Sequence, residues 1–152
     1  MSYEGTSGVD VNSPIGVVTA VASDATLKDD TIVLELVEDD PDLRTLLRIM
    51  LGRDARLSLM GEAASADAAI DLARDLHPGI VILDNGLEGL MTGMEAAPKI
   101  KAASPGVRVL LFSATDLEVE AADEPAIDCF LRKDRLSDLL PTIERMLGLQ
   151  HQ

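Results

Sequence analysis

Five short apolar runs, separated by stretches with helical spacing, constrain this chain more than any other feature. The runs cover residues 32–37, 57–62, 80–83, 107–112 and 127–132. Between them, apolar residues recur every three or four positions, as on the buried side of a helix. Strands that alternate with helices favour a parallel sheet whose two faces are both covered. The pattern therefore predicts an α/β fold, a doubly wound five-stranded parallel sheet with helices on both faces.

Helix boundary signals support this reading. Pro41 suits the first turn of the first helix, and Gly52 ends that helix. Further helices are expected over residues 68–76 and 94–103, because each stretch is followed by a proline and a glycine. A short polar helix is expected after the fourth strand, and Ser137 is predicted to cap the last helix.

Composition along the chain suggests three segments. Residues 1–29 are rich in small and polar residues and are predicted to form a flexible N-terminal extension. An alternative reading makes residues 15–21 an extra strand or a docking segment. The folded domain is expected over residues 30–149, followed by a short tail at residues 150–152.

The net charge of −14, from 27 acidic and 13 basic residues, excludes some partners. Such a chain repels phosphate backbones and anionic lipids, so direct binding to nucleic acid or membrane is not expected, although simple solubility explains much of the charge equally well. No apolar run is long enough to span a bilayer, and acidic residues stand where a secretion signal needs basic ones. We therefore expect a cytoplasmic protein.

Polar residues follow four of the predicted strands at their carboxyl ends. They are Glu38, Asp39, Asp40, Asp84, Ser113 and Lys133. In a doubly wound sheet these ends meet along one edge, where ligands bind. Carboxylates that share a crevice repel each other unless a cation is bound, and oxygen ligands suit Mg²⁺. Taken alone, each acid is more typical of a solvated turn or a helix cap, and Asp40 fits the cap best because it precedes Pro41.

Together these residue types favour phosphoryl chemistry. The carboxylate of Asp84 can attack phosphorus and form an acyl phosphate. A divalent ion would hold phosphoryl oxygens during the transfer. Lys133 offers a positive point charge, and Ser113 offers a hydroxyl donor to the new phosphoryl group.

In order and spacing, these strand ends resemble the receiver domains of two-component response regulators, over roughly residues 31–148. The motifs are Val37-Glu38-Asp39-Asp40-Pro41, Ile82-Leu83-Asp84, Leu111-Phe112-Ser113-Ala114 and Phe130-Leu131-Arg132-Lys133-Asp134. The resemblance implies the CheY-like, flavodoxin-like receiver fold. The pair Lys133-Asp134 is most similar to the subgroup that is usually joined to helix-turn-helix output domains.

The resemblance also implies a role for each site residue. Asp84 is expected to be the phosphoacceptor, Ser113 and Lys133 to contact the phosphoryl group, and Phe130 to fill the aromatic switch position. The implied ligands of Mg²⁺ are Glu38 (through water), Asp39, Asp84 and the backbone carbonyl of Gly86.

We therefore expect a stand-alone receiver, because only four residues follow Gly148. Its phosphoryl donor would be a sensor histidine kinase or a phosphotransfer protein. Phosphorylation would switch a face made by the fourth helix, fifth strand and fifth helix, which binds a downstream protein or a second copy of the chain. No enzymatic activity is expected beyond self-phosphorylation and autodephosphorylation.

Departures from the family pattern leave an alternative open. The loop after Asp84 has Glu88 where the family has proline, and Gly93 stands one position late, as if one residue were inserted. The segment 113–133 is also short. These changes favour an atypical receiver that acts as a phosphorylation-independent interaction module. A Mg²⁺-dependent phosphatase would need a second acid where Gly86 stands. Gly86 would also leave an acyl phosphate open to water.

Overall fold

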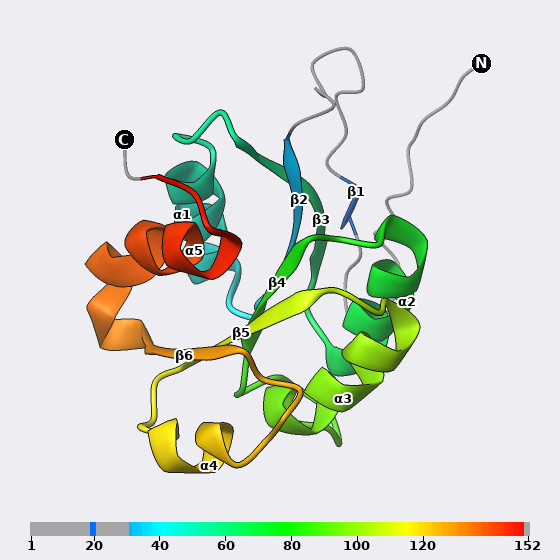
Figure 1. Cartoon of the computed structure of the whole chain (residues 1–152). Coiled ribbons are helices and arrows are strands. Elements are labelled where there is room, and N and C mark those ends of the chain that lie inside the picture. The colour runs from blue at the N-terminus through cyan, green and yellow to red at the C-terminus, as the bar shows by residue number, and fades with distance from the viewer. Residues whose placement is uncertain (1–18, 21–30, 151–152) are drawn as a thin grey trace, which may run out of the picture.

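The computed structural model describes residues 19–20 and 31–150 and contains one sheet in the strand order β1-β3-β2-β4-β5-β6 (Figure 1). Five neighbouring strands run parallel, which confirms the predicted sheet. They are β2 (Ile32–Val37), β3 (Leu57–Ala63), β4 (Ile80–Asp84), β5 (Arg108–Ser113) and β6 (Cys129–Arg132).

A sixth strand, β1 (Thr19–Ala20), pairs antiparallel with β3 at the edge of the sheet. It falls within the run 15–21 for which an extra strand was the alternative reading, and the rest of that run lies outside the described residues. The same holds for most of the predicted extension 1–29 and of the tail 150–152, so both remain predictions.

Helices cover both faces of the sheet (Figure 1). The described residues form the α-helices α1 (Pro41–Leu51), α2 (Ala66–Leu76), α3 (Gly93–Ala103), α4 (Glu118–Ala122) and α5 (Leu139–Leu147). One buried cluster joins α1 and α5 to the sheet, and a second joins α2, α3 and α4 to its other face. No helix in the described part of the chain is long and apolar enough to cross a membrane.

Successive side chains of a strand point to opposite faces of the sheet and so pack into the two clusters in turn. On β2, Leu34 and Leu36 pack toward α1 and α5, whereas Val37 packs toward α2 and α3. The period of two places Glu35 on the same side as Val37, and Glu35 is fully buried there. The middle of β2 therefore carries an ionisable group inside an apolar layer.

The last helix begins later than its sequence signals predict. Ser137 does not cap it: residues Lys133–Asp138 form a 3₁₀ helix, and α5 follows from Leu139 with no side-chain cap. Arg135 adopts a non-helical conformation (φ −116°, ψ 42°), which interrupts the chain before α5.

The strand order reverses between β2 and β4, since β3 lies on one side of that pair and β5 on the other. Helices leave these two strands toward opposite faces, because α1 and α3 belong to different buried clusters. Such a reversal opens a crevice at the carboxyl ends of the two strands, the usual ligand position in this architecture.

Candidate functional site

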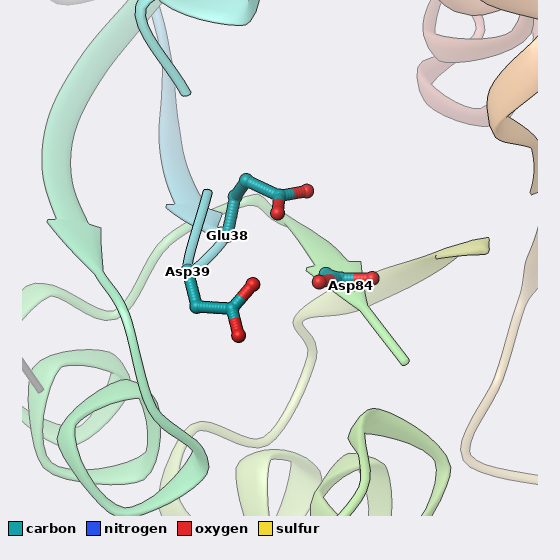
Figure 2. A group of neighbouring side chains, drawn as sticks. All are labelled: Glu38, Asp39 and Asp84. Carbon is teal, nitrogen blue, oxygen red and sulfur yellow. The ribbon is translucent and has the colours of Figure 1, made fainter. Parts of the chain in front are cut away.

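Three carboxylates meet at this crevice (Figure 2). Glu38 and Asp39 follow β2, and Asp84 is the last residue of β4. One oxygen from each lies within 4.8 Å of the other two. Glu38 and Asp84 are buried and Asp39 is half-buried, so their mutual repulsion is only weakly screened by water.

Lys133 supplies the opposing charge. It is the first residue after β6, and its Nζ lies 3.0 Å from Glu38 Oε1 and 3.0 Å from Asp84 Oδ1. Burial lowers the pKa of Lys133, but the hydrogen bonds to the two acids outweigh that effect and raise the pKa above its usual value. Lys133 is therefore a fixed cation between the two strand ends.

Glu38 is the most enclosed of the three acids. Its Oε2 accepts a hydrogen bond from the backbone N–H of Asp40 at 3.1 Å. Burial raises the pKa of Glu38 to about 7, against the lowering effect of the bonds from Asp40 and Lys133. Asp40 itself is exposed and caps α1 through the N–H groups of Asp42 and Leu43, as its place before Pro41 predicts.

The two oxygens of Asp84 differ. Oδ1 accepts a hydrogen bond from the backbone N–H of Gly86 at 3.0 Å and forms an ion pair with Lys133. Within residues 31–150, Oδ2 accepts no hydrogen bond. Gly86 is exposed, and a Cβ there would meet only Asp84 Oδ1, at 3.8 Å. The acceptor candidate is therefore oriented through one oxygen, and the neighbouring position 86 is exposed.

The loop between β4 and α3 crosses the crevice. The backbone N–H of Glu88 donates a hydrogen bond to Asp39 Oδ2 at 3.1 Å. Glu88 also pairs with Ser65 in an isolated parallel β-bridge. Gly89 then turns with φ +107°, a conformation that favours glycine. The altered loop thus contacts the acid cluster through its backbone, while the Glu88 carboxylate lies outside that cluster.

Gly93 is a site residue whose role the sequence analysis missed. A Cβ at this position would lie 2.2 Å from the carbonyl oxygen of Asp84, so only glycine allows α3 to begin here. Its N–H donates to the carbonyl of Asn85, and the Asn85 side chain accepts from Met94. In the sequence, the one sign of this role is that Gly93 stands one position later than the glycine of the family pattern.

Ser113 and Phe130 come from β5 and β6, the two strands that follow β4 in the sheet. Ser113 ends β5 and is buried, and its Oγ accepts from the N–H of Thr115 at 3.1 Å. Phe130 is half-buried on β6. No hydrogen bond joins Ser113 to Asp84 among the described residues.

The donor set fits a hard divalent cation. All side-chain donors in the cluster are carboxylate oxygens, which Mg²⁺ and Ca²⁺ prefer, and neither histidine nor cysteine is among them. Asp39 is partly accessible and opens the cluster to an ion arriving from solvent.

Comparison with known proteins identifies the family. The model of the response regulator receiver domain matches residues 34–144, more than half of the chain. The chain therefore belongs to the response regulator receiver domain family, as the strand-end motifs predicted. Receiver domains are signalling switches of two-component systems.

Relatives of known name are similar over the same region. The nitrate/nitrite response regulator protein NarL of Escherichia coli (strain K12) is 31% identical over 113 residues, covering 72% of this chain and 52% of NarL. The response regulator protein VraR of Staphylococcus aureus (strain Mu3) is 30% identical over 105 residues, covering 68% of this chain and 50% of VraR. The chain thus spans about half the length of these curated relatives.

A solved structure shows the same fold. The two-component response regulator of the LuxR family from Aurantimonas sp. SI85-9A1 superimposes with a TM-score of 0.72 at 28% identity, covering 80% of this chain and 89% of that one.

Proposed function

We propose that Asp84 accepts a phosphoryl group from a sensor histidine kinase or a phosphotransfer protein, in a Mg²⁺-dependent reaction. The supporting observation is the asymmetry of the Asp84 carboxylate. Gly86 and Lys133 bind its Oδ1, whereas Oδ2 accepts no hydrogen bond from the described residues. A carboxylate that is oriented through one oxygen presents the other as a nucleophile.

In this step, Oδ2 of Asp84 forms a bond to phosphorus while the bond from phosphorus to the donor nitrogen breaks. The nitrogen keeps that electron pair and takes up a proton, and Asp84 becomes an acyl phosphate. Lys133 lies within ion-pair distance of Asp84 and offsets the charge on the phosphoryl oxygens.

Glu38, Asp39, Asp84 and the backbone carbonyl of Gly86 would hold Mg²⁺. When bound, the ion would neutralise the acids and the phosphoryl oxygens. Asp39 is already oriented by the loop N–H of Glu88. Glu38 would contribute through water, as the resemblance to the family implies.

The modified protein would signal through the face made by α4, β6 and α5. A groove of about 730 Å³ lies there and includes Phe130, Arg132 and Arg145. The Ser113 hydroxyl would donate a hydrogen bond to the phosphoryl group, and Phe130 would change rotamer. The partner on this face would be a downstream protein or a second copy of the chain.

Intact-mass spectrometry after incubation with Mg²⁺ and acetyl phosphate tests the proposal. We expect one added phosphoryl group in the wild-type protein, and none with the Asp84→Asn variant or without Mg²⁺. Asp40→Asn is the matched control, because Asp40 is an acidic neighbour that caps α1 and asparagine keeps that cap. An adduct that persists in the Asp84→Asn variant would refute the assignment.

A second candidate is the phosphorylation-independent interaction module. It is favoured by α4, which has only five residues, and by the added negative charge of Glu88 beside the crevice. Absence of any adduct, together with absence of beryllofluoride binding, would support this candidate over the first.

A further inference from the structure

Arg44, on the first turns of α1, reaches the backbone of the acid cluster. Its Nη1 donates to the carbonyl oxygen of Glu38 at 2.7 Å. The Arg44 side chain is only 18% exposed, so this charge-assisted bond is largely shielded from water. None of the strand-end motifs includes this residue.

A buried acid on β3 anchors Arg44. Glu62 is 4% exposed, and its Oε1 lies 3.4 Å from Arg44 Nε. Arg48, one turn further along α1, binds the same carboxylate through two hydrogen bonds of 2.6 and 2.8 Å. Both arginines therefore bind Glu62, but of the two only Arg44 also donates a hydrogen bond to Glu38.

The bond to Arg44 fixes the peptide that joins the two acids. The carbonyl of Glu38 and the N–H of Asp39 belong to one planar unit, so holding the oxygen sets the rotation of the whole unit. On its other side, the N–H of Glu38 donates to the carbonyl of Ala63 at 3.0 Å. These two bonds restrain the backbone of Glu38 on both sides, and with it the peptide that leads into Asp39.

We propose that Arg44 is a positioning residue for the divalent-cation site. Through the 38–39 peptide it aims the carboxylates of Glu38 and Asp39 toward Asp84, and Glu62 keeps its guanidinium in place. Arg44 acts through the backbone and touches neither the cation nor the phosphoryl group. The inference rests on the proposed function, because it assumes that this cluster binds Mg²⁺.

Calorimetric titration with Mg²⁺ tests the inference through two matched variants. Arg44→Met removes the bond to Glu38, and we expect Mg²⁺ affinity to fall by about tenfold, the usual loss when a group that orients a metal ligand is removed. Arg48→Met removes the shorter bonds to Glu62 but leaves Glu38 untouched. It is expected to lower the melting temperature without weakening Mg²⁺ binding.

A metal-free readout accompanies the titration. The amide resonance of Asp39 reports the hydrogen bond on the preceding carbonyl, so it should shift in Arg44→Met and stay in place in Arg48→Met. Arg44→Lys keeps the charge and one donor, and intermediate affinity is expected. If Arg44→Met fails to fold, Arg44→Lys compared with Arg48→Lys provides the same test.

Equal Mg²⁺ affinity in wild type and the Arg44 variants would overturn the inference, as would an equal loss in the Arg48 variants. Failure of the proposed function looks different. A wild-type protein that binds Mg²⁺ but forms no phosphoryl adduct would refute phosphorylation and leave the role of Arg44 intact. A wild-type protein that binds no Mg²⁺ would overturn both.

Discussion

Two glutamates of the same strand region, Glu35 and Glu38, share burial but not surroundings. Their exposed fractions are 0% and 1%. Both oxygens of Glu35 lack a hydrogen-bond partner among the described residues, and burial raises its pKa to about 9. Glu38 forms an ion pair with Lys133 through Oε1 and accepts a hydrogen bond from the Asp40 N–H through Oε2, and its pKa is raised less, to about 7.

Position along β2 explains the difference. Glu35 lies opposite Gly61 on β3 and Val81 on β4, in the layer covered by α2 and α3. A register shift in β3 accompanies the pairing with Gly61, and Gly61 has no room for a side chain under Leu72 and Leu76. A carboxyl group in the middle of a covered strand has no partner, whereas one at the strand end meets groups from neighbouring strands.

Removing Lys133 would leave Glu38 without a counterion, as Glu35 is. We expect this change to have the largest effect on stability. Lys133→Met leaves two buried acids without their counterion, which costs about 4 kcal/mol of stability at pH 8 without Mg²⁺. Added Mg²⁺ should restore much of that loss. Urea unfolding measures both values, with the surface pair Arg132–Asp134 as control, where Arg132→Met costs at most about 1 kcal/mol. An equally small loss in Lys133→Met would contradict the comparison.

Neutralising Glu35 should stabilise the protein. Its pKa rises from 4.5 in the unfolded chain to about 9 in the folded protein. The stability that the protonated group contributes is complete below pH 4.5 and is lost as pH rises toward 9, because only the unfolded chain ionises in that window. Glu35→Gln is therefore expected to gain about 3 kcal/mol at pH 7. Unfolding curves at several pH values test this, and a gain that does not depend on pH would refute it.

Mg²⁺ binding should leave the Glu35 region unaffected. At ten times its dissociation constant, Mg²⁺ is expected to stabilise the wild-type protein by about 1.4 kcal/mol. Glu35→Gln should show the same increment, because the two acids share no partner. Thermal melts with Mg²⁺ or a chelator measure the increments. Unequal values would mean that the middle and the end of β2 are energetically coupled.

The two regions also differ in how easily water reaches the acidic side chain, and here we expect the smallest effect. Gly86 is exposed beside Asp84, whereas Glu35 is closed on every side. A side chain at position 86 meets no obstacle, so Gly86→Asn should fold normally and shield the acyl phosphate. We expect hydrolysis to slow by about fivefold, or about 1 kcal/mol in activation free energy. The decay of the phosphorylated mass measures it, and an unchanged rate would show that position 86 does not control access.

Much of the site could be predicted because it depends on local patterns and one rule of topology. The apolar run of β4 ends at Asp84, that of β2 ends before Glu38, and parallel strands bring their carboxyl ends to one edge. The same rule could not predict that the Lys133 side chain lies between Glu38 and Asp84, because it predicts where strand ends meet and not where side-chain atoms lie.

Other features depend on tertiary contact and leave little trace in the sequence. Glu35 interrupts an apolar run once, which is equally typical of a strand with one solvated face. Ser137 precedes a helical pattern and looks like a cap, yet the backbone at Arg135 delays α5. Gly93 reads as a loop glycine, since nothing nearby in the sequence reveals the approach of the Asp84 carbonyl.

The Asp84 carbonyl and Gly93 are packed closely, so the phosphoacceptor candidate is in direct contact with the start of α3. The carbonyl of Asp84 occupies the space that a Cβ of residue 93 would need, and the Gly93 N–H donates a hydrogen bond to the carbonyl of Asn85. We therefore expect the end of β4 and the first turn of α3 to move as one unit. In a hydrogen-exchange experiment, the amides of Asn85 and Gly93 are expected to open together, at a single rate. Any displacement of the backbone at Asp84 then becomes a displacement of α3.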